Sequence, residues 1–386
     1  MKTIILCFVL VLSLACGNNK DQKASVAKTL EVELDSLFDP VFSADKPGGS
    51  ILVMQGDEIK FLRSYGLADL NTKEKITEKT VFNTGSISKT FVSNGILILE
   101  QEGLLSIEDG LNKHFDDFDS DIIAEKITIK HLLSHSSGLP DLRKVSENTE
   151  FFMTAKDTAN FEPLKRTAVL NFEPGEKFEY SNPAFNGLAL IIEKLSKQRW
   201  QSFIKERIFK ASGMTDSKIT DGAYPRNGVA HAYILNDNNE YEEYDYGEFS
   251  TFAAAGNGGI WSSVLDLAKY EKALKDGSFL NKEIISNSRT IFEPLNWADS
   301  VKPYIGYSWF IGEESLLGTD DVYNTKFVYH TGSQGGFQAF YISIPEKDIL
   351  YIALFNSPVK EYRQIISEGI KLILSHIPSI LPSDLK

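Results

Sequence analysis

The chain has 386 residues, of which 42% are hydrophobic and 11% aromatic, so it can build one large packed domain or two. Its formal net charge of -13 and the absence of any lysine- or arginine-rich run argue against nucleic acid and anionic lipid surfaces as partners. A small molecule, a peptide or a neutral polymer is the expected partner.

The first residues have the pattern of an export signal. A lysine precedes an apolar stretch over residues 4–14, which is too short to cross a bilayer but has the length of a signal-peptide core. Ala15-Cys16-Gly17 follows and resembles the end of a bacterial lipoprotein signal, in which the cysteine is lipidated, although Ser13 stands where leucine is usual. Cleavage by ordinary signal peptidase near Ala15 is the alternative. We predict a signal peptide over residues 1–15 and, over residues 16–28, a polar tether lipidated at Cys16.

The segments after the tether predict a helix and then strands. Apolar residues recur at helical spacing from Leu30 to Val41, and Pro47-Gly48-Gly49 then turns the chain. Residues 50–55 and 59–65, separated by Gly56-Asp57, are predicted to form a hairpin.

Ser86 follows the tight turn Asn83-Thr84-Gly85 and opens a helix whose apolar face continues until Gly103. Residues three apart on a helix share a face, so the amine of Lys89 would reach the Ser86 hydroxyl and could take its proton. The S-x-x-K pattern occurs six times in the chain, so the spacing alone is a weak signal. Because only Ser86 has this turn and this helix, we predict that it is a nucleophile held rigidly against the core.

The middle of the chain is predicted to be mostly helical, and its last third returns to strands. Residues 104–300 contain helices joined by long loops, including one that opens at Ile127-Thr128 and runs through His131 and His135. Aromatic and β-branched residues mark four later strands, over residues 305–311, 326–331, 337–344 and 349–355. A helix with one apolar face follows them.

Strands at both ends of the chain around a helical middle predict an α+β fold. We expect one antiparallel sheet, flanked by helices, built from residues of about 45–85 and 302–378. A mostly helical domain of about residues 104–300 would be inserted between these parts, and the folded domain would span residues 29–380. The cleft between the sheet and the insert is where a ligand would bind.

Two further stretches have the residues of a reactive site. Tyr180-Ser181-Asn182-Pro183 follows a Pro-Gly turn, and His330-Thr331-Gly332-Ser333 ends a predicted strand. Each stretch also has a structural interpretation, because Asn182 could cap the helix that Pro183 opens and Tyr180 could be buried packing. The histidine could likewise be a structural residue of a glycine-rich strand end.

Taken together and in this order, Ser86-x-x-Lys89, Tyr180-x-Asn182 and His330-Thr331-Gly332 resemble the serine β-lactamase and penicillin-binding protein superfamily. The tyrosine in the second motif is similar to the class C β-lactamase branch with its D-alanyl-D-alanine carboxypeptidases and esterases. The resemblance runs from about Gly49 to Phe355 and implies the β-lactamase/transpeptidase-like fold.

This resemblance implies a role for each motif. Ser86 would be the acylated nucleophile, and Lys89 and Tyr180 would share the work of general base and proton shuttle, with either as the principal base. Asn182 would hydrogen-bond Lys89 or a substrate amide. The oxyanion hole would consist of the backbone N–H groups of Ser86 and Ser333.

His330, Thr331 and Gly332 would bind substrate from the strand. The departure from the family pattern is His330, where β-lactamases of this branch usually carry lysine, and it makes a carboxylate-anchoring positive charge conditional on pH. No metal and no cofactor is expected. His131 and His135 have metal-ligand spacing, but no glutamate follows His131 as in H-E-x-x-H, so core or capping roles are favoured.

We therefore predict a serine hydrolase that forms an acyl-enzyme on Ser86 and cleaves a small ester, an amide or a D-amino-acid peptide bond in the cell envelope. Carboxypeptidase and esterase activities are both open, and a β-lactamase or a catalytically silent scaffold that binds cell-wall peptide is the alternative. The protein would be exported to the periplasm and held at the membrane only through the lipid on Cys16, with no nucleic-acid partner.

Overall fold

The computed structural model describes residues 29–377 apart from 144, 146, 221–224, 226, 245–252, 291–303, 314–315 and 318–320. The predicted signal peptide, Cys16 and the tether lie outside these residues and stay predictions. Within the described part of the chain, no helix is both long enough and apolar enough to span a bilayer.

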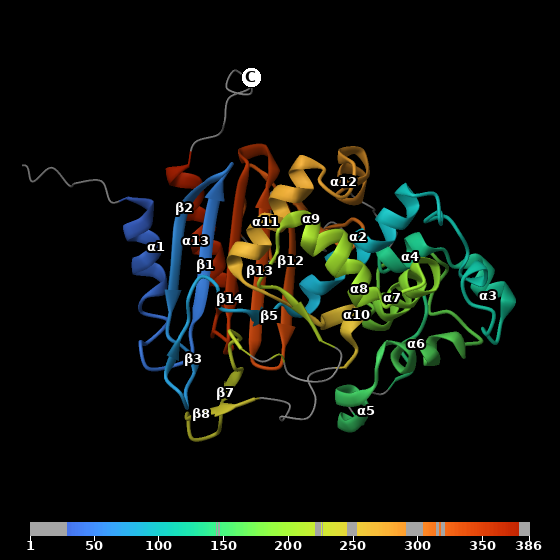
Figure 1. Ribbon diagram of the computed structural model, residues 1–386, viewed down its shortest axis with the longest axis horizontal. Coiled ribbons are helices and arrows are strands. Elements are labelled where there is room, and N and C mark those ends of the chain that lie inside the picture. The colour runs from blue at the N-terminus through green and yellow to red at the C-terminus, as the bar shows by residue number, and fades with distance from the viewer. Residues whose placement is uncertain are drawn as a thin grey trace, which may run out of the picture.

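A seven-stranded antiparallel sheet forms the centre of the molecule, with strand order β10-β11-β12-β13-β14-β1-β2 (Figure 1). Its strands are β1 (Gly49–Gln55), β2 (Glu58–Tyr65), β10 (Tyr304–Ile305), β11 (Phe310–Glu313), β12 (Lys326–Gln334), β13 (Phe337–Ile344) and β14 (Ile349–Phe355). The pairing of β1 with β14, in which Gly49 lies opposite Phe355, joins the two ends of the chain. This confirms the predicted sheet built from both ends.

Alternate residues of the central strands face two separate cores, as the two-residue period of a strand requires. Ile51 and Val53 of β1 pack with α1 (Leu30–Phe38) and α13 (Tyr362–His376), whereas Leu52 belongs to the larger core on the other face. Helices α2 (Ser88–Gln101) and α11 (Val264–Asp276) cover that second face. The sheet is therefore enclosed on both faces by helices.

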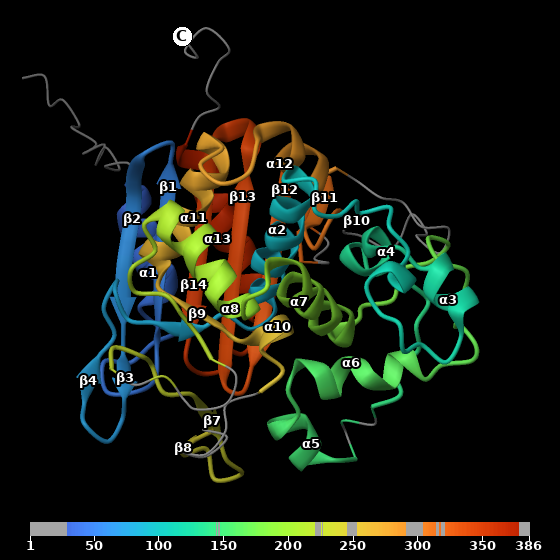
Figure 2. The ribbon, with the colours of Figure 1, turned by 45° about the vertical axis from the view of Figure 1, so that its right-hand side comes forward.

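The insert extends from the α2 side of the sheet and carries most of the remaining helices (Figure 2). Its helices are α3 (Asp121–Lys126), α4 (Ile129–Leu133), α5 (Thr149–Thr154), α6 (Asp157–Lys165), α7 (Asn182–Ser196), α8 (Trp200–Ile204), α9 (Lys210–Ser212), α10 (Ala255–Gly258) and α12 (Lys282–Ser288). Short strands form three further small sheets: β3 (Leu67–Asp69) with β4 (Glu74–Lys75), β7 (Tyr233–Leu235) with β8 (Tyr241–Glu243), and β9 (Ile260–Ser262) between β5 (Phe82–Asn83) and β6 (Lys218–Ile219).

Three local predictions were wrong. The strand predicted over residues 305–311 is two short strands, because Ser308 has a φ of 65° and reverses the chain between them. The helix predicted through His135 ends at Leu133, since His135 has a φ of 55°, which a helix does not allow. The helix expected to open at Ser86 begins at Ser88 and is preceded by a single 3₁₀ turn, Gly85–Ile87.

A buried carboxylate links α11 to the sheet. Glu271 is 1% exposed and accepts hydrogen bonds from Arg289, Tyr341 and Ser343. Burial alone would raise the pKa of Glu271, but the charge and hydrogen bonds of Arg289, with the Tyr341 hydroxyl, outweigh it and bring the pKa to about 2. The ionised carboxylate therefore stabilises the packing of α11 on β13.

We expect Glu271→Gln to remove a pH-dependent part of the stability. The folded pKa of about 2 lies below the unfolded value of 4.5, so the carboxylate stabilises the fold above pH 4.5 and this contribution is lost toward pH 2. A shift of this size corresponds to about 3 kcal/mol. Free energies of unfolding from urea titrations between pH 2 and 7 would measure it. Ser343→Ala keeps the carboxylate and is the control; parallel pH curves for wild type and Glu271→Gln would contradict the assignment.

Candidate active site

The turn before α2 and the end of β12 meet backbone to backbone. A Cβ atom built on Gly332 would lie 1.9 Å from the Thr84 carbonyl oxygen and 3.1 Å from the Ser86 amide nitrogen. One built on Gly85, whose φ is +52°, would lie 2.8 Å from the Ser333 amide nitrogen. Only glycine permits this approach, so the two predicted oxyanion amides, those of Ser86 and Ser333, lie on facing backbone segments.

Lys89 is completely buried beneath Ser86. Its Nζ lies 3.0 Å from the Ser86 Oγ and donates a hydrogen bond of 2.9 Å to the carbonyl oxygen of Asn257. The described residues give Lys89 no carboxylate partner. Burial, with a smaller contribution from the charge of Arg143, holds the pKa of Lys89 well below its usual value. A neutral amine is therefore favoured beside the serine hydroxyl.

Tyr180 lies in the loop that precedes α7 and lines the same cavity as Ser86. Lys89 Nζ lies 5.1 Å from the centre of its ring. Although 37% of the residue is exposed, the burial of the phenol raises its pKa, so the hydroxyl stays protonated at neutral pH. A protonated phenol can pass a proton but cannot be the resting base.

His135 holds this loop in place. Its ring stacks on Tyr180 with centroids 4.4 Å apart, and its Nδ1 accepts a 3.0 Å hydrogen bond from the amide of Ser181. Burial lowers the pKa of His135 well below its usual value, and the charges of Lys89 and His330 act in the same direction. A neutral imidazole is needed here, because Nδ1 must be bare to accept the bond.

His330 is also buried and neutral. Its Nδ1 bonds the Thr331 carbonyl oxygen at 2.6 Å, and its Nε2 has no partner among the described residues. Burial first, and the charge of Lys89 second, lower the pKa of His330 to about 3. The predicted charge that depends on pH near neutrality was therefore wrong, because this imidazole is enclosed rather than solvated.

A cavity of about 420 Å³ opens above Ser86. Its described lining has no permanently charged side chain and comprises Ser86, Tyr180, Phe310, His330, Thr331, Gly332, Ser333, Gln338, Phe340 and Tyr362. Along one side β11 pairs with β12 only as far as Tyr329, so residues 330–334 of β12 have no strand partner on that edge within the described chain. A ligand in the cavity would meet aromatic rings and the free edge of a strand.

Most of the predicted site residues lie together, and Asn182 does not join Lys89. The Asn182 side chain has no hydrogen bond within the described chain and does not line the cavity, and Ser181 is the residue that caps α7. The expected bond to Lys89 is absent from the described structure and Ser181 takes the place of Asn182 as helix cap, while a bond from Asn182 to a substrate amide stays a prediction.

Two residues have roles in the site that the sequence does not reveal. His135 lies just beyond α4, and its bond to Ser181 spans 46 positions and has no local signal. The carbonyl of Asn257, which accepts from Lys89, is a backbone group and is invisible in side-chain patterns.

His131 and His135 do not share a helix face. The Nδ1 of His131 accepts from the amide of Thr128 and completes the capping box of α4, while His135 lies beyond the end of that helix. Within the described residues, no group of three or more histidine, cysteine, aspartate or glutamate side chains could hold a metal ion.

The comparisons with known proteins identify the family. The Beta-lactamase family matches residues 32–374, and the chain belongs to that family, whose members are mostly serine hydrolases. Penicillin-binding protein 4* of Bacillus subtilis (strain 168) is 27% identical over 365 residues, which cover 90% of this chain and 77% of that protein. Protein flp of Staphylococcus aureus (strain MW2) is 26% identical over 80% of this chain, which spans 59% of its length.

Solved structures agree with the fold. The octameric penicillin-binding protein homologue from Pyrococcus abyssi superposes with a TM-score of 0.75 at 27% identity, covering 89% of this chain and 77% of that one. The D-amino acid amidase from Ochrobactrum anthropi SV3, complexed with L-phenylalanine amide, gives a TM-score of 0.70 at 20% identity over 90% and 98% of the chains, a likeness of fold alone. The resemblance to the serine β-lactamase and penicillin-binding protein superfamily is confirmed.

Proposed function

We propose that this protein is a serine hydrolase that forms an acyl-enzyme on Ser86 and cleaves neutral amides, small esters or D-amino-acid peptide bonds. The observation that carries this proposal is the buried Lys89 amine, which lies 3.0 Å from the Ser86 hydroxyl and has no carboxylate to hold a proton on it. An unactivated serine is a poor nucleophile at neutral pH, and a neutral amine at this distance supplies the missing base.

In acylation, the lone pair of Lys89 takes the Ser86 proton as Oγ attacks the substrate carbonyl carbon. The negative charge that develops on the carbonyl oxygen meets the amides of Ser86 and Ser333. The ammonium that forms on Lys89 lies 5.1 Å from the centre of the Tyr180 ring and 5.9 Å from that of Phe185, and contact with these ring faces lowers its energy. This interaction exists only once the proton has moved, so it favours the transition state.

Collapse of the tetrahedral intermediate requires a proton on the leaving group. Tyr180 lines the cavity together with Ser86 and its hydroxyl is protonated, so it can give its proton to the departing nitrogen or oxygen and recover one from Lys89. Deacylation repeats these steps with water in place of Ser86. In this scheme Lys89 is the base and Tyr180 the shuttle.

The cavity supports neutral substrates over anionic ones. The His330 side chain is uncharged at physiological pH and the described lining has no permanently charged side chain, so the cavity offers a substrate carboxylate no cation. Four aromatic rings in the lining suit an apolar group next to the scissile bond: Tyr180, Phe310, Phe340 and Tyr362. The free edge of β12 can pair with a substrate amide. These features favour amidase or esterase activity over β-lactam hydrolysis.

Export and lipid anchoring remain part of the proposal and rest on the sequence of residues 1–28. Penicillin-binding protein 4* of Bacillus subtilis is a relative with a name that refers to penicillin, and the D-amino acid amidase shares the fold. These names support a substrate with an amide bond.

The direct test is covalent labelling of Ser86. A fluorophosphonate should add one phosphonyl group as the Oγ–P bond forms and fluoride leaves, and intact-protein mass should show the adduct in wild type but not in Ser86→Ala. Ser88→Ala, on the same helix and buried, is the matched control and should still react. Absence of an adduct in correctly folded wild type would refute the proposed nucleophile.

Tyr180→Phe tests the shuttle, because it keeps the ring over Lys89 and removes only the hydroxyl. We expect kcat for an amide to fall about a hundredfold or more, within the range of general acid–base assistance, with little change in melting temperature. An ester with a good leaving group needs no proton and should be affected less. Equal losses for amide and activated ester would contradict the assignment of Tyr180 as proton donor.

Because His330 is neutral, we expect the selectivity of the enzyme for substrate charge not to change with pH. Since its pKa is about 3, the ratio of kcat/KM for a matched acid and neutral ester should stay constant between pH 5 and 8. His330→Asn, which cannot be protonated, should leave that ratio constant too. A ratio that rises on acidification in wild type but not in His330→Asn would show that the imidazole becomes charged and binds the carboxylate.

A further inference from the structure

A second buried carboxylate lies close to the reactive pair and has no part in the chemistry proposed above. Asp157 begins α6 and is 7% exposed. Its Oδ1 accepts hydrogen bonds from the amide of Gly256 at 2.8 Å and from the Asn186 side chain at 2.6 Å, and its Oδ2 accepts one from the Trp200 indole at 2.9 Å. No cationic side chain among the described residues forms an ion pair with Asp157, so burial of its charge is costly.

The two hydrogen bonds to Oδ1 both connect Asp157 to the segment Gly256-Asn257. Gly256 is the residue before Asn257 in α10. The side-chain oxygen of Asn186, Oδ1, accepts a 2.9 Å hydrogen bond from the Asn257 side-chain amide. The backbone oxygen of Asn257 then accepts from Lys89 Nζ. Asp157 therefore holds the Gly256-Asn257 segment in two ways. It bonds the Gly256 amide directly, and it bonds the Asn186 side chain, which in turn bonds the Asn257 side chain.

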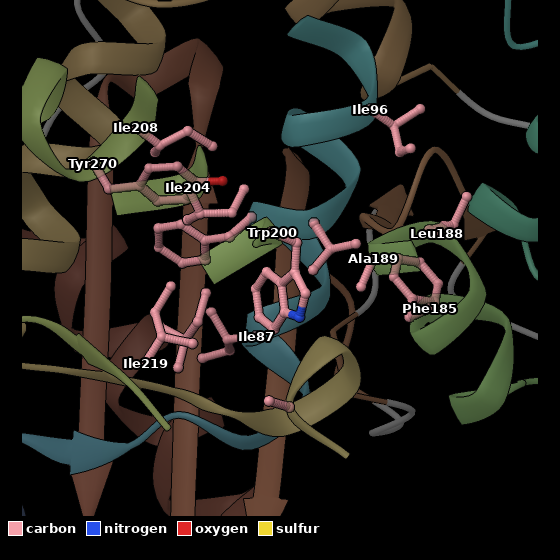
Figure 3. Packing of buried hydrophobic residues seen from close by; sticks show 14 of the residues in the cluster. Ile87, Ile96, Phe185, Leu188, Ala189, Trp200, Ile204, Ile208, Ile219 and Tyr270 are labelled. Carbon is pink, nitrogen blue, oxygen red and sulfur yellow. The ribbon is translucent and has the colours of Figure 1, made fainter. Parts of the chain in front are cut away.

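The bond to Oδ2 leads elsewhere. Trp200 opens α8 and its ring lies in the large apolar core with Phe185 and Ala189 of α7 (Figure 3). No hydrogen bond in the described chain connects Trp200 onward to Lys89. The carboxylate thus has one oxygen directed toward the reactive pair and one toward the core.

We propose that Asp157 is a positioning residue, which acts through Asn186 and the Gly256-Asn257 segment to orient the Lys89 amine toward Ser86. A neutral amine has two hydrogens and one lone pair, so a fixed acceptor for one hydrogen determines where the lone pair points. The Asn257 carbonyl is that acceptor, and Asp157 fixes the carbonyl. Loss of the Asp157 hydrogen bonds would let the Asn257 carbonyl move and would misdirect the lone pair. Small misplacements of a catalytic group cost large factors in rate.

The electrostatics of Asp157 agree with an ionised acceptor. Burial raises its pKa to about 6 and the charge of Glu193 adds to this, while the bonds from Gly256, Asn186 and Trp200 act in the opposite direction. All three described partners are donors, so the ionised form satisfies them at neutral pH. Burial of an unpaired carboxylate costs free energy. The presence of Asp157 here is therefore better explained by a need for two strong hydrogen-bond acceptors at this position than by packing.

The test measures labelling by a fluorophosphonate as kinact and KI, and it presupposes that Ser86 is acylated as proposed above. Asp157→Ala removes both acceptor oxygens, and we expect kinact to fall by about 10- to 100-fold with KI nearly unchanged. Asn186→Leu cuts only the side-chain route and should lower kinact by a smaller factor. The double variant should lose less than the product of the two factors, because both act on one segment.

Trp200→Phe is the matched control, since it removes the donor to Oδ2 and leaves both Oδ1 bonds. It should lower the melting temperature but keep the wild-type kinact. If Asp157→Ala is too unstable to purify, Asn186→Leu and Trp200→Phe still decide the question. Equal kinact in wild type and Asn186→Leu, or equal losses of kinact in Asn186→Leu and Trp200→Phe, would overturn the positioning role. A wild-type protein that does not label at all would instead refute the proposed function.

Discussion

The site depends on one backbone contact, the approach of β12 at Gly332 to the Thr84 carbonyl and the Ser86 amide. No side chain fits between these segments, so the contact needs glycine on the strand and, because of its positive φ, glycine at position 85 as well. It brings the amides of Ser86 and Ser333 onto facing backbones. Next to this contact, β11 pairs with β12 only as far as Tyr329, so residues 330–334 have no strand partner on that edge within the described chain.

Burial without a counter-ion is the second constraint. Lys89, His135 and His330 are each 1% exposed or less, and burial is the largest cause that lowers the pKa of each. Each is therefore favoured in its neutral form, and each then offers a lone pair. A single added carboxylate near Lys89 would restore its proton and remove the base. The protein as a whole is acidic, with a net charge of -13, but the described lining of this cavity contains no acidic side chain.

The two buried carboxylates differ in what they hold. Glu271 is paired with Arg289 and joins α11 to the sheet, so its ionisation is strongly favoured and it serves stability. Asp157 is surrounded by neutral donors, so its charge is held by hydrogen bonds alone. This contrast explains why the burial penalty is outweighed at Glu271 and not at Asp157, where it still raises the pKa.

The sequence by itself determined the sheet from both chain ends, the hairpin of β1 and β2, and the positions of Ser86, Lys89 and Tyr180, because these depend on local periodicity and on short motifs. It did not determine that α4 ends at Leu133, before His135, or that β10 and β11 separate at Ser308, since a single positive φ overrides a periodic pattern. Only the tertiary structure decided the state of His330 and the acceptors of Lys89. Protonation follows from desolvation, and a backbone carbonyl 168 positions away has no signature in the residues around Lys89.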